Sequence, residues 1–152
     1  MDARKEGFYR VILQENFPAM EGAIELIDSL VAAGFVLAVG SSGPPENIEL
    51  SLQKLGRAQC FAARITGMDV AHGKPDPEVF LLAAKRLGVA PSQCAVIEDA
   101  PAGIAAARAG GMTAIALTGT APMAKLGTAH LIVDSLRELT PERIAHLVRI
   151  RQ

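Results

Sequence analysis

From the middle of the chain onward, short apolar runs alternate with amphipathic segments. Short apolar runs between turn residues are typical of buried strands, and longer amphipathic segments are typical of helices. This order predicts an α/β fold: a doubly wound, Rossmann-like parallel sheet with helices on both faces. The predicted strands are 35–39, 63–66, 94–97, 113–117 and 131–133, and the predicted helices are 20–33, 44–55, 78–87, 102–109 and a last one capped by Thr140.

Several predicted helix ends carry the residues that favour such ends. Gly34, Gly56 and Gly88 each follow a helix, where glycine adopts the left-handed backbone that stops it. Asp76 is predicted to be the N-cap of the helix at 78–87, with Pro77 in the first turn.

The first stretch of the chain has a different pattern. Residues 2–16 are typical of a helix, and no strand comes before them. A doubly wound fold normally begins with a strand. We therefore expect the chain to start in the middle of such a fold.

Composition narrows the class of protein without identifying a function. Half of the 152 residues are apolar and 20% are charged, as in one ordinary globular domain. The formal net charge of −1 gives no electrostatic reason to bind nucleic acid or an anionic membrane.

The chain starts with charged residues and has no apolar stretch long enough to span a bilayer, so we expect a soluble, cytoplasmic protein. We expect Cys60 and Cys94 to be reduced thiols.

Polar side chains with chemical potential follow three of the predicted strands. They are Ser41 and Ser42, then Lys74, then Glu98 and Asp99. Ligands of open α/β sheets bind at the carboxyl ends of the strands. Hydroxyl and backbone N–H groups in such a loop could hold a phosphate, and adjacent carboxylates at the end of a buried strand favour a hard cation such as Mg²⁺.

Each of these residues also has a plainer interpretation. Serines after a strand are common turn and cap residues. A loop lysine is usually solvated, although Lys74 is held between a glycine and a proline. Asp99 could simply cap the helix that follows it.

Taken together and in order, these segments resemble the haloacid dehalogenase superfamily. GKPDPEVF (73–80), VIEDAPAGI (96–104) and AARAG (106–110) are similar to its third and fourth motifs, and VGSS (39–42) is similar to its second. The branch that they resemble contains β-phosphoglucomutase and small-sugar phosphatases.

The resemblance implies a role for each candidate residue. Ser41, with the Ser42 backbone N–H, would bind the transferring phosphoryl group, and Lys74 would neutralise its developing charge. Asp99, with Glu98 beside it, would bind Mg²⁺ directly or through water. Phosphoryl transfer depends mainly on such positioning and charge neutralisation. The implied ligand is a small phosphorylated metabolite.

The chain departs from the family pattern at one point. Family members attack with an aspartate from an Asp-x-Asp motif on their first strand, and these 152 residues contain no Asp-x-Asp. The resemblance therefore implies that residues 1–18 are a remnant of a helical cap, that residues 19–152 are the core, and that a central strand is lacking between those ending near Gly40 and Asp99. The two open edges could pair directly, accept a strand from another copy, or have lost a fragment.

Three functional hypotheses remain. The chain could be a truncated phosphatase or phosphomutase core, inactive alone. It could be a non-catalytic module or partner subunit that binds phosphate or metal. A domain of another doubly wound family, such as a receiver domain, fits the Lys-Pro and Glu-Asp motifs poorly.

Overall fold

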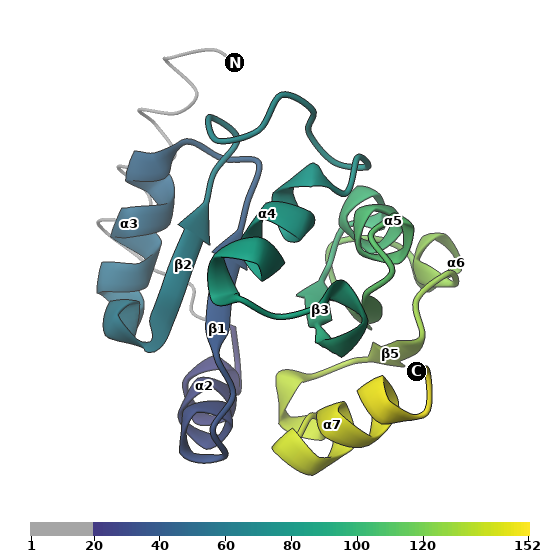
Figure 1. The fold of residues 1–152 in the computed structure, drawn as a ribbon. Helices are drawn as coiled ribbons and strands as arrows, with labels where there is room; N and C mark the ends of the chain where they lie inside the picture. Colours follow the sequence, from purple (N-terminus) through teal and green to yellow (C-terminus); the bar gives the residue numbers. More distant parts are fainter. Residues whose placement is uncertain (1–19) are drawn as a thin grey trace.

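The structure, a computed structural model, describes residues 20–152. The predicted helix at 2–16 and the predicted cap remnant at 1–18 lie outside the described residues. From residue 20 onward the chain alternates strands and helices, and Figure 1 shows helices packed around the strands.

All five predicted strands are present. They are β1 (Leu37–Gly40), β2 (Phe61–Ile65), β3 (Ala95–Glu98), β4 (Thr113–Leu117) and β5 (Leu131–Val133). The first begins two residues later than predicted and extends to Gly40.

The five predicted helices of this region are also present, and a sixth is added. They are α2 (Ala23–Ala32), α3 (Pro45–Leu55), α4 (Glu78–Leu87), α5 (Pro101–Ala109), α6 (Met123–Leu126) and α7 (Pro141–Arg149). The sequence pattern did not predict α6, which is only four residues long, nor the short 3₁₀ turns η1 (Ala58–Cys60), η2 (Pro91–Gln93) and η3 (Leu136–Glu138).

The helix ends follow the predicted chemistry with one difference. Gly34, Gly56 and Gly88 have φ values of 84°, 68° and 68°, the left-handed backbone expected after a helix. The residue that precedes α4 is Pro77 rather than Asp76. The Asp76 carboxylate still accepts a hydrogen bond from the Glu78 N–H at 2.9 Å. Asp76 therefore lies one residue before the N-cap position that was predicted for it.

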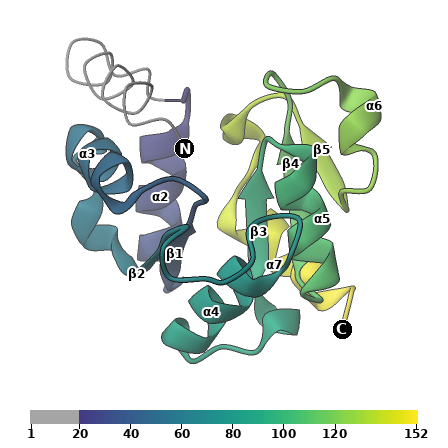
Figure 2. The same cartoon turned by 90° about the horizontal axis from the view of Figure 1, so that it is seen from above.

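The strands form two parallel sheets rather than one. β1 pairs with β2, and β4 lies between β3 and β5. Within the described residues, β1 and β3 do not pair with each other. Figures 1 and 2 show the β1–β2 pair on one side and the other three strands on the opposite side, with β1 and β3 nearest to one another.

The two sheets nevertheless pack against the same two groups of helices, one on each face. Leu37 in β1 and Ala95 in β3 pack against the apolar cluster built around α2, α7 and η3. The next residue in each strand, Ala38 or Val96, packs against the other cluster, built around α4, α5 and α6. Because side chains alternate across a strand, this shared alternation places the two sheets as halves of one layer with helices on both faces.

The gap between the halves leaves its two flanking strands incompletely buried. Every residue of β4 is buried, as expected for a strand in the middle of a parallel sheet. No residue of β1 or β3 is fully buried, and Ile97 is 37% exposed. Among the described residues, β1 and β3 therefore each keep one edge without a paired strand.

None of the helices described from residue 20 onward is long and apolar enough to cross a membrane.

Hydrogen exchange should report the division of the sheet. We expect the amides of β4, which is paired on both sides, to exchange at least about an order of magnitude more slowly than those of β1 and β3. Exchange measured by NMR or mass spectrometry on dilute protein checks this. Equal protection of β1, β3 and β4 would contradict an open gap, and protection that appears only on concentration would indicate pairing between copies.

Candidate active site

All five residues singled out by the sequence surround one cleft. It has a volume of about 600 Å³ and lies at the carboxyl ends of β1 and β3. Apolar side chains, among them Met20, Ile97 and Leu117, form the rest of its wall. The polar part of the lining includes Ser41, Ser42, Lys74, Glu98 and Asp99.

Lys74 is held in place by three contacts. Its ammonium group forms an ion pair with the Glu98 carboxylate and donates a hydrogen bond to the Gly40 carbonyl at 3.2 Å. It also lies 4.7 Å from the centre of the Phe80 ring, within the range of a cation–π interaction. The Lys74 side chain is only 13% exposed, so the interpretation as a solvated loop lysine is wrong.

The Glu98 carboxylate organises the end of β3. Besides the ion pair with Lys74, it accepts hydrogen bonds from the N–H groups of Asp99 and Ala100, at 3.2 and 3.4 Å. The carboxylate lies against the α-carbon of Gly103 in α5, and a Cβ added there would overlap it. An alanine at position 103 would therefore force the Glu98 carboxylate to move from its present place beside Lys74.

Asp99 does not cap α5. The residue before that helix is Ala100, and no side chain within the described part of the chain caps it. Instead, Asp99 accepts a hydrogen bond from the Thr120 hydroxyl at 2.5 Å. Sequence reasoning missed Thr120, although its position just after β4 places it at the same edge of the sheet as Asp99.

The loop after β1 uses Ser41 within its own turn. The Gly43 N–H donates to the Ser41 hydroxyl oxygen at 3.1 Å, and the Ser41 N–H donates to the Ile65 carbonyl at 3.0 Å. A hydroxyl that accepts one hydrogen bond can still donate its own proton to an oxyanion. The turn interpretation and the phosphate-binding interpretation are therefore compatible. Ser42 is exposed.

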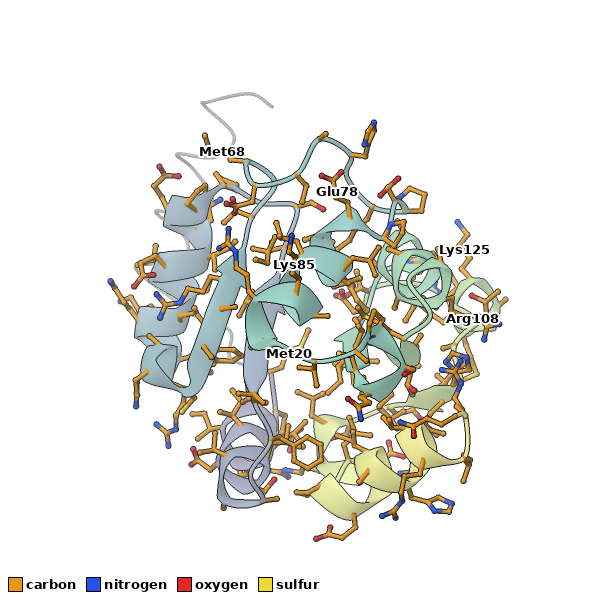
Figure 3. The ribbon with its side chains drawn as sticks, in the orientation of Figure 1. Met20, Met68, Glu78, Lys85, Arg108 and Lys125 are labelled. Carbon is orange, nitrogen blue, oxygen red and sulfur yellow. The ribbon has the colours of Figure 1, made fainter. Side chains whose placement is uncertain are left out.

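A second residue missed from the sequence fixes the loop that carries Lys74. The Glu78 carboxylate accepts hydrogen bonds from the N–H groups of Ala71 and His72, at 3.0 and 2.8 Å. These backbone donors hold the pKa of Glu78 below its usual value. Figure 3 shows Glu78 at the start of α4, beside this loop. The His72 side chain itself is 74% exposed.

The charges of the cleft leave a place for a cation. Glu98 balances Lys74, whereas Asp99 has a hydroxyl partner and no cationic partner among the described residues. Residues 20–152 contain no cluster of three or more histidine, cysteine or acidic side chains able to enclose a metal ion. Mg²⁺ commonly takes one or two protein carboxylates, and water or phosphate oxygens complete its shell. Asp99 fits such a site, whereas Glu98 is already engaged by three donors.

A family model described as haloacid dehalogenase-like hydrolase matches residues 2–111 of this chain. The chain belongs to the haloacid dehalogenase-like hydrolases. This agrees with the motifs that surround the cleft and with the parallel α/β fold.

Characterised relatives act on phosphorylated small molecules, as their names state. The chain is 41% identical over 128 residues to validoxylamine A 7'-phosphate phosphatase of Streptomyces hygroscopicus subsp. limoneus. The match covers 84% of this chain and 59% of that enzyme. It is 36% identical over 141 residues to the β-phosphoglucomutase of Bacillus subtilis, covering 91% of this chain and 60% of that enzyme. The chain thus spans about three fifths of the length of these relatives.

Solved structures give the same fold. The crystal structure of β-phosphoglucomutase from Clostridium difficile superposes on this chain with a TM-score of 0.85 at 28% sequence identity. The superposition covers 96% of this chain and 64% of that enzyme. The α/β, Rossmann-like fold predicted from the sequence is confirmed.

Replacing Gly103 by alanine tests the packing beneath the ion pair. The added methyl group would push the Glu98 carboxyl group away from Lys74, and we expect Gly103→Ala to lower the free energy of unfolding by about 1–3 kcal/mol. Urea denaturation followed by circular dichroism measures this change.

Gly73→Ala is the matched control, because a Cβ at position 73 meets no atom within 4 Å among the described residues. It should change the free energy of unfolding by less than about 0.5 kcal/mol. Equal effects of the two substitutions would contradict a specific role for the glycine under Glu98.

Proposed function

We propose that this chain supplies the phosphate- and metal-binding part of a phosphatase or phosphomutase that acts on small phosphate monoesters. The observation that carries the proposal is the single cleft that gathers Ser41, Lys74 and Asp99, with Ser42 and Glu98 beside them, at the carboxyl edge of the sheet. The phosphorylated substrates in the names of validoxylamine A 7'-phosphate phosphatase and β-phosphoglucomutase support the substrate class.

In the proposed site the phosphoryl group lies between the loop after β1 and the Lys74 ammonium. The Ser41 hydroxyl and the Ser42 N–H would donate to its oxygens, and Lys74 would offset negative charge as it builds up in transfer. The ion pair with Glu98 and the Gly40 carbonyl hold the ammonium at the cleft before the substrate binds. Little binding energy is then spent on ordering this side chain.

Asp99 is the proposed magnesium ligand. The Thr120 hydroxyl would orient its carboxylate, as partners of metal ligands commonly do. Glu98 would act through water or through Lys74, because its oxygens already accept hydrogen bonds from that ammonium and from two backbone N–H groups. Mg²⁺ bound there would neutralise charge on the phosphate and lower the repulsion between it and a carboxylate nucleophile.

The proposed nucleophile is an aspartate that these 152 residues do not supply in an Asp-x-Asp motif. A strand placed between β1 and β3, parallel to both, would end at the cleft beside Lys74. An aspartate on that strand would form the aspartyl-phosphate of the family mechanism. Loss of a covalent nucleophile costs on the order of 10⁶ in rate, so we propose that the chain alone does not turn over.

The alternative is a non-catalytic protein that binds phosphate or metal, or a subunit completed by another chain. The open edges of β1 and β3 support this alternative, because they could hold a strand from a second copy. In either case we expect a cytoplasmic protein whose ligand is a small phosphorylated metabolite.

Binding and turnover should separate in this chain. With Mg²⁺ present, calorimetry should detect saturable binding of inorganic phosphate, while phosphate release from a panel of sugar phosphates stays at background. Lys74→Ala should weaken phosphate binding about tenfold or more, because it removes a charge-assisted hydrogen bond. Asp99→Asn should weaken Mg²⁺ binding by a similar factor.

Two substitutions outside the cleft serve as matched controls. Lys85→Ala is the control for Lys74→Ala and removes an exposed lysine of α4. Asp134→Asn is the control for Asp99→Asn, because Asp134, like Asp99, accepts a hydrogen bond from a threonine hydroxyl, that of Thr118 at 2.7 Å. Both should leave binding unchanged. Phosphate binding that is absent in the unaltered protein, or that Lys74→Ala leaves unchanged, would overturn both versions of the proposal.

Adding an N-terminal strand that carries Asp-x-Asp distinguishes the two versions. The extended chain should release phosphate from at least one sugar phosphate in the presence of Mg²⁺, and changing the first added aspartate to asparagine should abolish release. Continued phosphate binding without turnover by the extended chain would favour the non-catalytic alternative.

A further inference from the structure

A cluster of basic groups lies at the opposite end of the sheet from the cleft. Arg108 comes from the last turn of α5, His130 immediately precedes β5, and Arg151 follows α7. The cluster surrounds the beginning of β4, since Arg151 donates to the Thr113 hydroxyl at 3.1 Å. Because all strands are parallel, this end is remote from the carboxyl edge that carries Lys74.

The contacts within the cluster place hydrogen-bond donors around one ring. The Ala114 N–H lies 2.8 Å from His130 Nδ1, and Arg151 Nη1 lies 3.1 Å from the same nitrogen. Arg108 Nη1 lies 2.7 Å from the other ring nitrogen, Nε2. Donors therefore face both sides of the imidazole.

A histidine cannot satisfy such a set of donors. A neutral imidazole has one acceptor nitrogen and one N–H, and a protonated ring has no acceptor at all. The Ala114 N–H makes Nδ1 the acceptor, so Nε2 carries the hydrogen and points it at the guanidinium of Arg108. That contact brings two donors together, and neither has a protein acceptor for this hydrogen among residues 20–152, so only solvent or a bound anion can accept there.

The surrounding charges do not compensate for this arrangement. Arg108 and Arg151 form no ion pair with any described carboxylate. The pKa of His130 is held below its usual value by burial, and also by the positive charges of Arg151 and Arg108. Figure 3 shows Arg108 on the same side of the molecule as Lys125 of α6, which adds a further positive charge to this side.

From this geometry we infer that Arg108, His130 and Arg151 form a second anion site, which binds the phosphate group of a small molecule. An oxyanion beside Arg108 and the Nε2–H of His130 would accept from both donors and balance the two guanidinium charges. Guanidinium groups suit phosphate because their N–H groups diverge toward separate oxygens. The site differs from the proposed catalytic cleft in its residues and in its place in the fold.

Titration of the 152-residue protein with inorganic phosphate, at constant ionic strength, tests the site by NMR. The Ala114 amide should shift saturably, because it donates to the ring that the anion contacts. The amides of Gly43 and Asp99 report the cleft separately. Acetate at the same concentrations should bind at least about tenfold more weakly at the second site, as the loss of one charge-assisted hydrogen bond implies.

Arg108→Gln is the decisive variant, since within residues 20–152 the hydrogen-bonding distance of its side chain is to His130 alone. It should weaken the phosphate response of Ala114 about tenfold or more and leave the responses of Gly43 and Asp99 unchanged. Arg86→Gln, an equal change of charge on α4, is the control and should leave Ala114 unaffected. Circular dichroism verifies that both variants are folded.

Three results would overturn the inference. One is an Ala114 amide that does not respond to phosphate in the unaltered protein. Another is a response that Arg108→Gln preserves. The third is acetate binding as tight as phosphate binding, which would replace the phosphate site with a general carboxylate site.

Discussion

The Lys74 ammonium joins the ends of two strands that do not pair with each other. It donates to the last carbonyl of β1 and forms an ion pair with the last side chain of β3, across the gap that divides the sheet. Both side chains of the ion pair are almost buried, at 13% and 11% exposure. Leaving one such charge without its partner costs about 3–5 kcal/mol when burial is complete. The shape of the cleft therefore depends on this lysine, as does the chemistry proposed for it.

The remaining connection between the two halves is apolar. The cluster around α4 and α5 includes Ile65 of β2 together with Ala114 and Ala116 of β4, so it spans both sheets. The cluster on the other face joins Leu26 and Leu30 of α2 to Ile115 and Leu117 of β4. Helices thus hold together a layer whose own hydrogen bonds are interrupted. Apolar burial is non-directional, which is why it can maintain the layer without hydrogen bonds between β1 and β3.

Most of the fold was predictable because the signals for it are local. Glycine stops, proline starts and apolar runs located five strands and five helices, with errors of a few residues at their ends. Strand order gave the edge of the sheet at which Ser41, Lys74 and Asp99 gather.

Contacts between side chains were less accessible to prediction from the sequence. Thr120 reaches Asp99 across 21 residues. Glu78 lies only six or seven residues from the backbone groups that it holds, but the direction of its side chain is not encoded in sequence spacing. Nor could the sequence pattern predict the ion pair between Glu98 and Lys74, since the adjacent carboxylates of Glu98 and Asp99 suggested a shared metal.

The continuous faces of the divided sheet restrict what could occupy the gap. Leu37 and Ala95 point to one helical layer, while Ala38 and Val96 point to the other. A segment inserted between them would be covered on both sides, so it would have to be apolar along its length rather than on alternate residues. Sliding it by one residue would exchange all of its side chains between the two layers. The order of large and small residues along the whole segment would therefore determine whether it fits the gap. A peptide of the same composition in scrambled order would not fit.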